Sequence, residues 1–280
     1  MDVLVTGADS KAGVEIMARL RASGARVRTT SHLLGHGARE ATVDRVAVDF
    51  LRPETLDAAF SGIEVAVLIT PEDSGMVAMA ANLVAAAEEA HVAHIVYLSF
   101  LHADSGIGGP LLAWHSGAER VVSASAVPST CLRPNYYMQN FLSAYSPAAS
   151  IGGGRISYID AGDVADVVVR VAAGGGHEHS IYSLTGPRAL SAEEVAELLH
   201  GEIGPPLTYA TRGWEDACLL GRRSAQSALT QVLCEFWLAA SEDEFAVTTA
   251  DFEQLTGRTP RSFESFVREH RGQFHAVRTA

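Results

Sequence analysis

Two ionisable residues, His115 and Glu119, stand four positions apart in a segment, residues 111–124, whose apolar residues have helical spacing. Positions four apart on a helix project from the same face, so the two side chains are expected to be neighbours. Imidazole titrates near neutral pH, and His115 could therefore give a proton to an oxygen that gains negative charge during a reaction. A histidine that only packs and hydrogen-bonds is the alternative, and the sequence leaves both open.

A phenol, Tyr137, is the second candidate acid. It follows Pro134 and an apolar, strand-like run at residues 129–133. Open α/β sheets bind ligands at the carboxyl ends of their strands, so a side chain at this position is expected to face a ligand. Tyr137 could act as an acid or, with Tyr136, form the aromatic wall of a pocket, and the residue types favour the wall.

The first thirteen residues predict a phosphate-binding turn. An apolar run at residues 3–5 leads to Gly7, which allows a sharp turn, and Gly13 lets the next helix lie close to the strand. This first strand, a helix at residues 11–22 and a second strand at 25–30 together form a βαβ unit of the usual ~30 residues. This pattern is typical of dinucleotide-binding folds.

Ser10 stands where a glycine would let the backbone approach a pyrophosphate. Its hydroxyl could donate a hydrogen bond to phosphate, whereas its Cβ narrows the approach, and the sequence does not decide between them. About 20 residues after the turn, NAD-binding folds usually carry a carboxylate for the ribose 2′-hydroxyl. Thr30, Ser31 and His32 stand there instead, which favours NADP(H) over NAD. Lys11, the sole lysine of the chain, could add positive charge for a phosphate.

The predicted cofactor contacts lie in the glycine turn or at the carboxyl ends of predicted strands. They are Gly7, Asp9, Ser10, Lys11, Ala12, Gly13, Ser31, His32, Thr70, Pro71, Ser99, Phe100, Pro134 and Asn135. No metal site is expected, because His177 and His179 have no further ligand at close spacing and the three cysteines are widely separated.

Composition limits the class of protein. Hydrophobic residues make up 48% of the 280 residues and charged residues 19%, which excludes a disordered chain. No apolar stretch approaches the ~20 residues that span a membrane, and no secretory signal is visible, so we expect a cytoplasmic protein. A net charge of −12 disfavours nucleic acid and leaves a small-molecule substrate as the expected partner of a monomer or homodimer.

Strand-like runs alternate with helical segments, which predicts an α/β, Rossmann-like, doubly wound parallel sheet. The predicted strands are 3–6, 25–30, 45–49, 65–70, 94–99, 129–133 and 180–184, and the crossover helices are 11–22, a segment after Pro53, 74–90 and 111–124. A further short strand at 156–159 is expected to rejoin the sheet. We divide the chain into a Rossmann core, residues 1–150, a return to the sheet, 151–186, and a smaller, mostly helical substrate-side cap, 187–280.

Several segments together resemble the NmrA-like branch of atypical short-chain dehydrogenase/reductase proteins over nearly the whole chain. They are Val-Thr-Gly-Ala-x-x-x-x-Gly at the N-terminus, Val48-Asp49-Phe50, Ile69-Thr70-Pro71, Val96-Tyr97-Leu98-Ser99, Cys131-Leu132-Arg133-Pro134-Asn135 with Tyr137-Met138-Gln139-Asn140, Ile159-Asp160 to Asp163-Val164-Ala165, and Leu255 to Phe263. The resemblance implies binding of NADPH or NADH. It also implies either reduction of quinones, enones and small carbonyls or sensing of the dinucleotide without turnover.

The Tyr-x-x-x-Lys pair of other short-chain dehydrogenases is absent, and His115 with Glu119 stands at about its place. By this resemblance His115 is the candidate acid, and Glu119 is structural. The leading interpretation is an NADPH-dependent reductase of a small or polycyclic carbonyl, enone or quinone. An alanine- and arginine-rich composition, typical of GC-rich genomes, fits a role in secondary metabolism. The alternatives are a dinucleotide sensor or regulator, or a redox-neutral cyclase or isomerase that binds no dinucleotide, which Ser10 and His32 together suggest.

Overall fold

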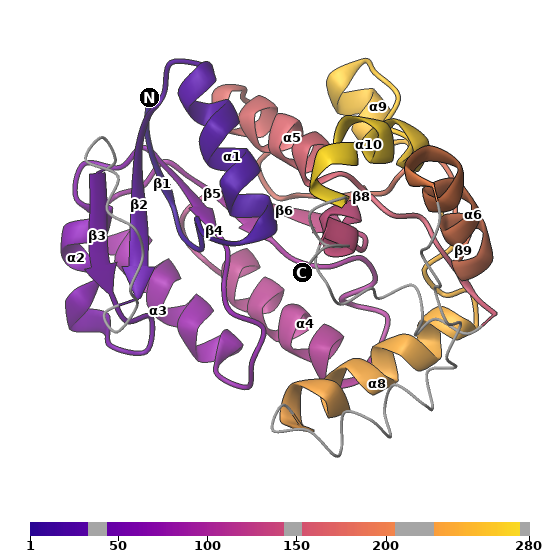
Figure 1. The fold of residues 1–280 in the computed structure, drawn as a ribbon. Coiled ribbons are helices and arrows are strands. Elements are labelled where there is room, and N and C mark those ends of the chain that lie inside the picture. Colours follow the sequence, from indigo (N-terminus) through magenta and orange to yellow (C-terminus); the bar gives the residue numbers. More distant parts are fainter. Residues whose placement is uncertain (33–43, 143–152, 205–226, 275–280) are drawn as a thin grey trace. The chain divides into compact units, whose positions relative to one another are not determined.

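The computed structural model describes residues 1–32, 44–142, 153–204 and 227–274 (Figure 1). Seven strands form one sheet in the order β3-β2-β1-β4-β5-β6-β8. Their bounds are β1 (Asp2–Val5), β2 (Arg26–His32), β3 (Asp44–Val48), β4 (Val65–Leu68), β5 (His94–Leu98), β6 (Ser129–Pro134) and β8 (Ser180–Leu184). All neighbouring pairs from β3 to β6 are parallel, so the predicted doubly wound sheet is confirmed.

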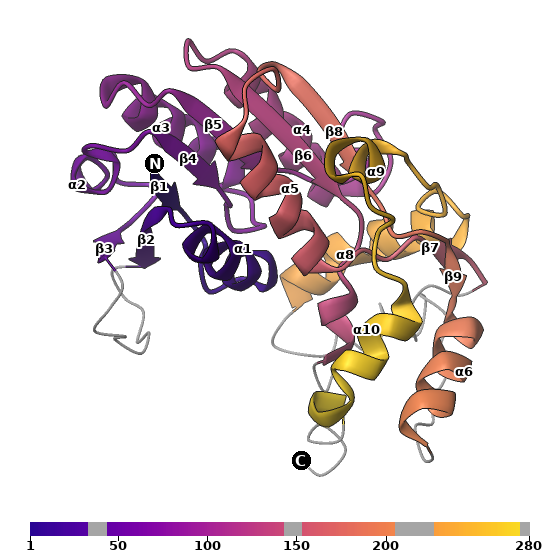
Figure 2. The ribbon, with the colours of Figure 1, turned by 90° about the horizontal axis from the view of Figure 1, so that it is seen from above.

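The chain forms two compact units. The first contains Met1–Ala103, Trp114–Arg133 and Val164–Tyr182. Its helices are α1 (Lys11–Ala22), α2 (Asp57–Phe60), α3 (Met76–Glu89) and the parts of α4 (Gly109–Ser123) and α5 (Ala161–Ala173) within those ranges, with a short 3-10 helix, η1 (Pro53–Thr55). Within this unit α1 and α5 cover one face of the sheet, and α2, α3 and α4 cover the other (Figures 1 and 2). An ion pair at 2.7 Å between Arg19 and Asp166 joins α1 to α5.

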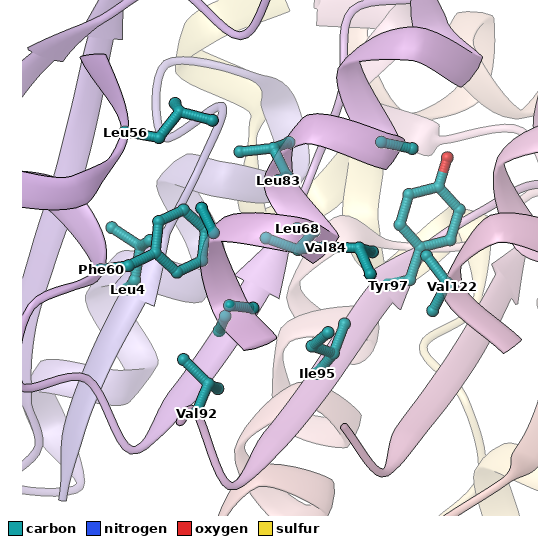
Figure 3. Close-up of a cluster of buried hydrophobic side chains, with 14 of the residues drawn as sticks. Leu4, Leu56, Phe60, Leu68, Leu83, Val84, Val92, Ile95, Tyr97 and Val122 are labelled. Carbon is teal, nitrogen blue, oxygen red and sulfur yellow. The ribbon is translucent and has the colours of Figure 1, made fainter. Parts of the chain in front are cut away.

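The core of the first unit lies between the sheet and helices α2, α3 and α4 (Figure 3). Leu4, Leu68 and Tyr97 come from alternating positions of central strands, and Leu83 and Val122 from the facing helices. Strands buried on both faces need continuous apolar runs, which is why β4 and β5 have no exposed residue. This core fixes the strands whose carboxyl ends carry the candidate site.

The second unit contains Asp104–Ala113, Pro134–Asp163 and Ser183–Ala280. Its described elements are mostly helical: η2 (Met138–Leu142), α6 (Ala192–Ile203), α8 (Ser227–Ser241), α9 (Asp251–Thr256) and α10 (Phe263–Glu269). A capping box begins α6, because Ser191 Oγ accepts from the Glu194 N–H while Glu194 Oε2 accepts from the Ser191 N–H. No helix in the described ranges is long and apolar enough to cross a membrane.

One strand prediction was wrong. Residues 156–159 do not rejoin the main sheet: β7 (Arg155–Ile156) pairs antiparallel with β9 (Leu190–Ser191) in a separate two-stranded sheet. Ile159 forms only an isolated bridge to Tyr137. The partner of β7 lies about 35 residues further along the chain, so no local sequence pattern could indicate it, and the main sheet is extended by β8 instead.

Candidate functional site

The turn between β1 and α1 needs both of its glycines. Gly7 has φ +60°, and a Cβ there would lie 3.0 Å from the Cβ of Ile69. A Cβ on Gly13 would lie 2.3 Å from the carbonyl oxygen of Gly7, closer than side-chain carbons approach backbone. Thr6 joins the turn to the end of β4, because its Oγ1 donates to the Ile69 carbonyl at 2.9 Å and accepts from the Ile69 N–H at 2.7 Å. These two hydrogen bonds hold the carboxyl ends of β1 and β4 together beside the turn.

Ser10 is the N-cap of α1. Its Oγ accepts a hydrogen bond from the Gly13 N–H at 3.0 Å, and its backbone N–H donates to the Gly7 carbonyl at 2.9 Å. The hydroxyl hydrogen is left to donate elsewhere. The first amide groups of a helix have no intrahelical partner, so Lys11 and Ala12 also present N–H groups at this end. Amides and the positive end of the helix dipole at one point make a site for an anion such as phosphate.

A pocket of about 370 Å³ opens at this turn. Its lining is the turn from Gly7 to Ser10 and the residues at the carboxyl ends of β2, β3 and β4, with one residue of α3. These are Gly7, Ala8, Asp9, Ser10, Thr30, Ser31, Val48, Asp49, Phe50, Leu51, Ile69, Thr70, Pro71, Asp73 and Met79. The sheet order reverses between β1 and β4, and ligands of open α/β sheets bind at this kind of switch point.

Six predicted cofactor contacts are brought together in that lining: Gly7, Asp9, Ser10, Ser31, Thr70 and Pro71. Lys11, Ala12 and Gly13 follow directly in the first turn of α1, with Lys11 exposed. His32 ends β2 opposite Val48, but its side chain lies outside the described residues. Within the described residues, the end of β2 offers the hydroxyl groups of Thr30 and Ser31 and no carboxylate.

Sequence reasoning missed part of the pocket. Leu51 and Met79 add apolar surface, and Asp49 adds a half-buried carboxylate. The Asp49 side chain is fixed, because its Oδ1 accepts from the Leu51 N–H at 2.9 Å. The position of Asp49 directly after strand β3 was a usable signal, since the strand-end rule applies to β3 as it does to β4.

The second group of candidates lies around His115, also within the first unit. His115 is 3% exposed, and neither ring nitrogen has a hydrogen-bond partner among the described residues. Its Nε2 lies 3.7 Å from Oε1 of the exposed Glu72, and its ring centroid lies 5.7 Å from that of Phe100. The Ser99 hydroxyl at the end of β5 is likewise buried without a partner among the described residues. Buried polar groups normally have partners, so these two side chains are candidates to meet a ligand.

Neighbouring ionisable groups are structural. Arg133 binds both carboxylate oxygens of Glu119, at 2.8 and 2.6 Å, and both residues are buried, as the structural interpretation of Glu119 expects. The Tyr97 hydroxyl lies 3.3 Å from Thr70 Oγ1, and burial raises the pKa of Tyr97 well above its usual range. Tyr97 is therefore a neutral, buried phenol whose hydroxyl pairs with Thr70.

The remaining predicted residues, Pro134, Asn135 and Tyr137, belong to the second unit. The Asn135 amide donates to Ser157 Oγ and to the Phe245 carbonyl, and its oxygen accepts from the Tyr136 N–H. These bonds give Asn135 a structural role within that unit. Pro134 is buried and Tyr137 half-buried, and their predicted contacts with cofactor or substrate stay predictions. No metal-binding cluster of His, Cys, Asp or Glu occurs in the described ranges.

A parallel sheet with a glycine turn, a capped helix and a pocket at the switch point defines a dinucleotide-binding protein of the Rossmann class. The chain belongs to the NAD(P)H-binding family, whose model matches residues 7–174. The NAD(P)-binding class and the fold class expected from sequence are thereby confirmed.

Two curated relatives are reductases by name. The chain is 31% identical to the NAD(P)H azoreductase of Xenophilus azovorans, over 98% of this chain and 100% of the relative. It is 29% identical to quinone oxidoreductase 2 of Escherichia coli, over 75% of this chain and 76% of the relative. Among solved structures, the fold matches NmrA, a negative transcriptional regulator in complex with NAD, with a TM-score of 0.77, 16% identity and coverage of 100% and 98%. The relatives support the predicted oxidoreductase class.

Proposed function

We propose that this protein is an NADPH-dependent reductase of a small or polycyclic conjugated compound, an enone, quinone or other carbonyl. The observation that carries the proposal is the pocket at the capped glycine turn, which offers amides, hydroxyls and apolar walls where a dinucleotide needs them. The relatives named azoreductase and quinone oxidoreductase support reduction of conjugated acceptors.

NADPH is preferred because the end of β2, the strand end that holds the ribose in dinucleotide-binding folds, has hydroxyls in place of a carboxylate. In the described residues, Thr30 and Ser31 occupy the end of β2 where NAD-specific folds place an acid. Lys11 begins α1 and is exposed, so it adds positive charge at the phosphate end. Gly7 and Gly13 keep the backbone clear of side chains, and Ser10 turns a hydroxyl hydrogen toward a phosphate oxygen.

The protein's own chemical contribution is proton delivery and orientation. When bound, the reduced nicotinamide supplies the hydride. His115 Nε2, with Glu72 beside it, donates the proton that the substrate oxygen takes up, and Ser99 donates a hydrogen bond that orients the reacting group. The buried setting of both side chains strengthens these interactions by excluding water. Tyr137 serves as an aromatic contact or as a second acid for the substrate.

We further propose that the protein works in the cytoplasm in secondary metabolism, as a monomer or homodimer, without binding nucleic acid. The net charge of −12 supports the last point, since it opposes approach of a phosphate backbone.

The test is a titration with NADPH and NADH, followed by Trp fluorescence, and then an assay of NADPH oxidation with a quinone, an enone and an azo dye. The proposal expects tighter binding of NADPH and oxidation with at least one acceptor. Binding without oxidation would support a sensor like the regulator NmrA, whose fold the chain shares. Absence of binding would overturn both and favour a redox-neutral cyclase or isomerase.

A further inference from the structure

An arginine that the sequence did not single out lies beside the phosphate-binding turn. Arg45, in β3, places its Nη2 3.3 Å from Oδ1 of Asp9. Asp9 belongs to the turn and lines the pocket. The Arg45 side chain is 24% exposed and that of Asp9 71% exposed, so the cation is largely packed in place while its carboxylate partner is open to solvent.

The pleat of the sheet puts Arg45 on the side where α1 begins. Arg45 pairs with Thr29 of β2 and Val46 with Thr30. Val46 packs against the core cluster on the α3 side of the sheet, and alternate residues of a strand point to opposite faces. Arg45 therefore points to the face that carries α1, and its ion pair with Asp9 shows that the guanidinium reaches the turn.

The chemistry around Arg45 and the glycine turn fits a phosphate on the ribose of a dinucleotide. The ribose end of a dinucleotide lies at the end of the second strand, beside the glycine turn, and an arginine nearby accommodates a 2′-phosphate. Guanidinium matches phosphate geometry with two parallel hydrogen bonds, which a histidine or lysine does not offer. The Asp9 carboxylate is open to solvent, and an ion pair with an exposed partner is weak, so a phosphate dianion can replace Asp9 at the guanidinium.

We propose that Arg45 is the residue that recognises the 2′-phosphate of NADPH, and that Asp9 holds its guanidinium at the turn until the phosphate arrives. The pair thereby sets the preference for NADPH over NADH. This inference rests on the proposed function for the class of cofactor, but it concerns binding and not turnover.

The experiment compares two fragments that differ only in that phosphate, adenosine 2′,5′-bisphosphate and AMP, by calorimetry without any substrate. Arg45→Met should weaken binding of the bisphosphate about tenfold or more, as expected for loss of a hydrogen-bonded charge pair, and change the Kd for AMP by no more than about twofold. Arg45→Lys should lose less affinity for the bisphosphate than Arg45→Met does, because lysine keeps the positive charge but lacks the planar guanidinium. Asp9→Asn should increase the preference for the bisphosphate, since the competing carboxylate is gone.

The matched control is Arg26→Met. Arg26 pairs with Asp2 at the amino end of β2, far along the strand from the pocket, and its loss changes net charge equally. Arg26→Met should leave the Kd values for the bisphosphate and for AMP unchanged. Equal weakening of both fragments by Arg45→Met, or the same effect from Arg26→Met, would overturn the inference. Failure of wild-type protein to bind either fragment or NADPH would overturn the proposed function instead.

Discussion

The Ser10 hydroxyl oxygen accepts a hydrogen bond from the Gly13 N–H at 3.0 Å, so the residue that replaces the usual glycine closes the first turn of α1. The sequence left open whether Ser10 helps or hinders a phosphate. The structure gives it a definite role as a cap whose hydroxyl hydrogen is still available. Because the Ser10 hydroxyl oxygen caps α1, its removal should lower the stability of the protein.

Ser10→Ala should lower the free energy of unfolding by about 1 kcal/mol, because alanine cannot cap a helix, whereas Ser10→Gly should cost only a few tenths. Denaturant titration of the three proteins measures both values. Equal losses for the two variants would contradict the capping role of the hydroxyl.

Gly13→Ala should destabilise the protein by about 2 kcal/mol or more and abolish NADPH binding, since the new Cβ would lie 2.3 Å from the Gly7 carbonyl oxygen. Gly201→Ala in α6 is the matched control, because a Cβ there meets nothing within 4 Å. In the control, the free energy of unfolding should rise by about 0.5–1 kcal/mol, because alanine has a better helix propensity than glycine, and NADPH binding should be normal. If both variants behaved alike, the close approach of α1 to the turn would not matter for the site.

His115→Ala should lower kcat about 100-fold or more while leaving the Kd for NADPH nearly unchanged, because proton donation is lost and the cofactor pocket is not lined by His115. His94→Gln is the control: His94 is also buried, but its Nε2 lies 2.9 Å from Thr130 Oγ1, at the amino end of β5. Its loss should affect stability and not kcat. Unchanged turnover in His115→Ala would remove the imidazole from the mechanism.

The stability of the protein should fall as Asp163 ionises. Burial raises the pKa of Asp163 from 3.8 to about 6, helped by Asp160 and opposed by the Arg261 N–H and the charges of Arg261 and Arg258. A raised folded-state pKa means that the protonated carboxyl is favoured in the fold. Its stabilising contribution is complete below about pH 4 and is lost as the pH rises through about 6, a change of about 3 kcal/mol for a shift of two units.

Asp163→Asn keeps an acceptor for the Arg261 N–H and removes this titration. The difference in unfolding free energy between variant and wild type should therefore grow in favour of the variant between pH 4 and pH 7. Denaturant titration across that range provides the measurement. Parallel curves for the two proteins would mean that burial of Asp163 has no energetic consequence.

The sequence was sufficient where the signal is local. The turn from Gly7 to Gly13 lies within a few residues and forms as predicted, and the cap of α6 has an equally local signal, since Ser191 and Glu194 stand three positions apart. Features formed by segments far apart in the chain could not be predicted from the sequence. The pairing of β7 with β9 and the ion pair of Arg45 with Asp9 join residues about 35 positions apart, and their formation depends on tertiary packing. Met79 likewise reaches the pocket only because α3 packs across the sheet.

The central claim, that hydride passes from NADPH to a conjugated acceptor, is tested most directly with NADPH deuterated at C4 of the nicotinamide. Reduction of an enone by this cofactor should show a primary isotope effect on a single turnover and place deuterium on carbon in the product. Turnover of the enone with no deuterium transferred, or stable binding of NADPH with no oxidation by any acceptor tested, would contradict the account.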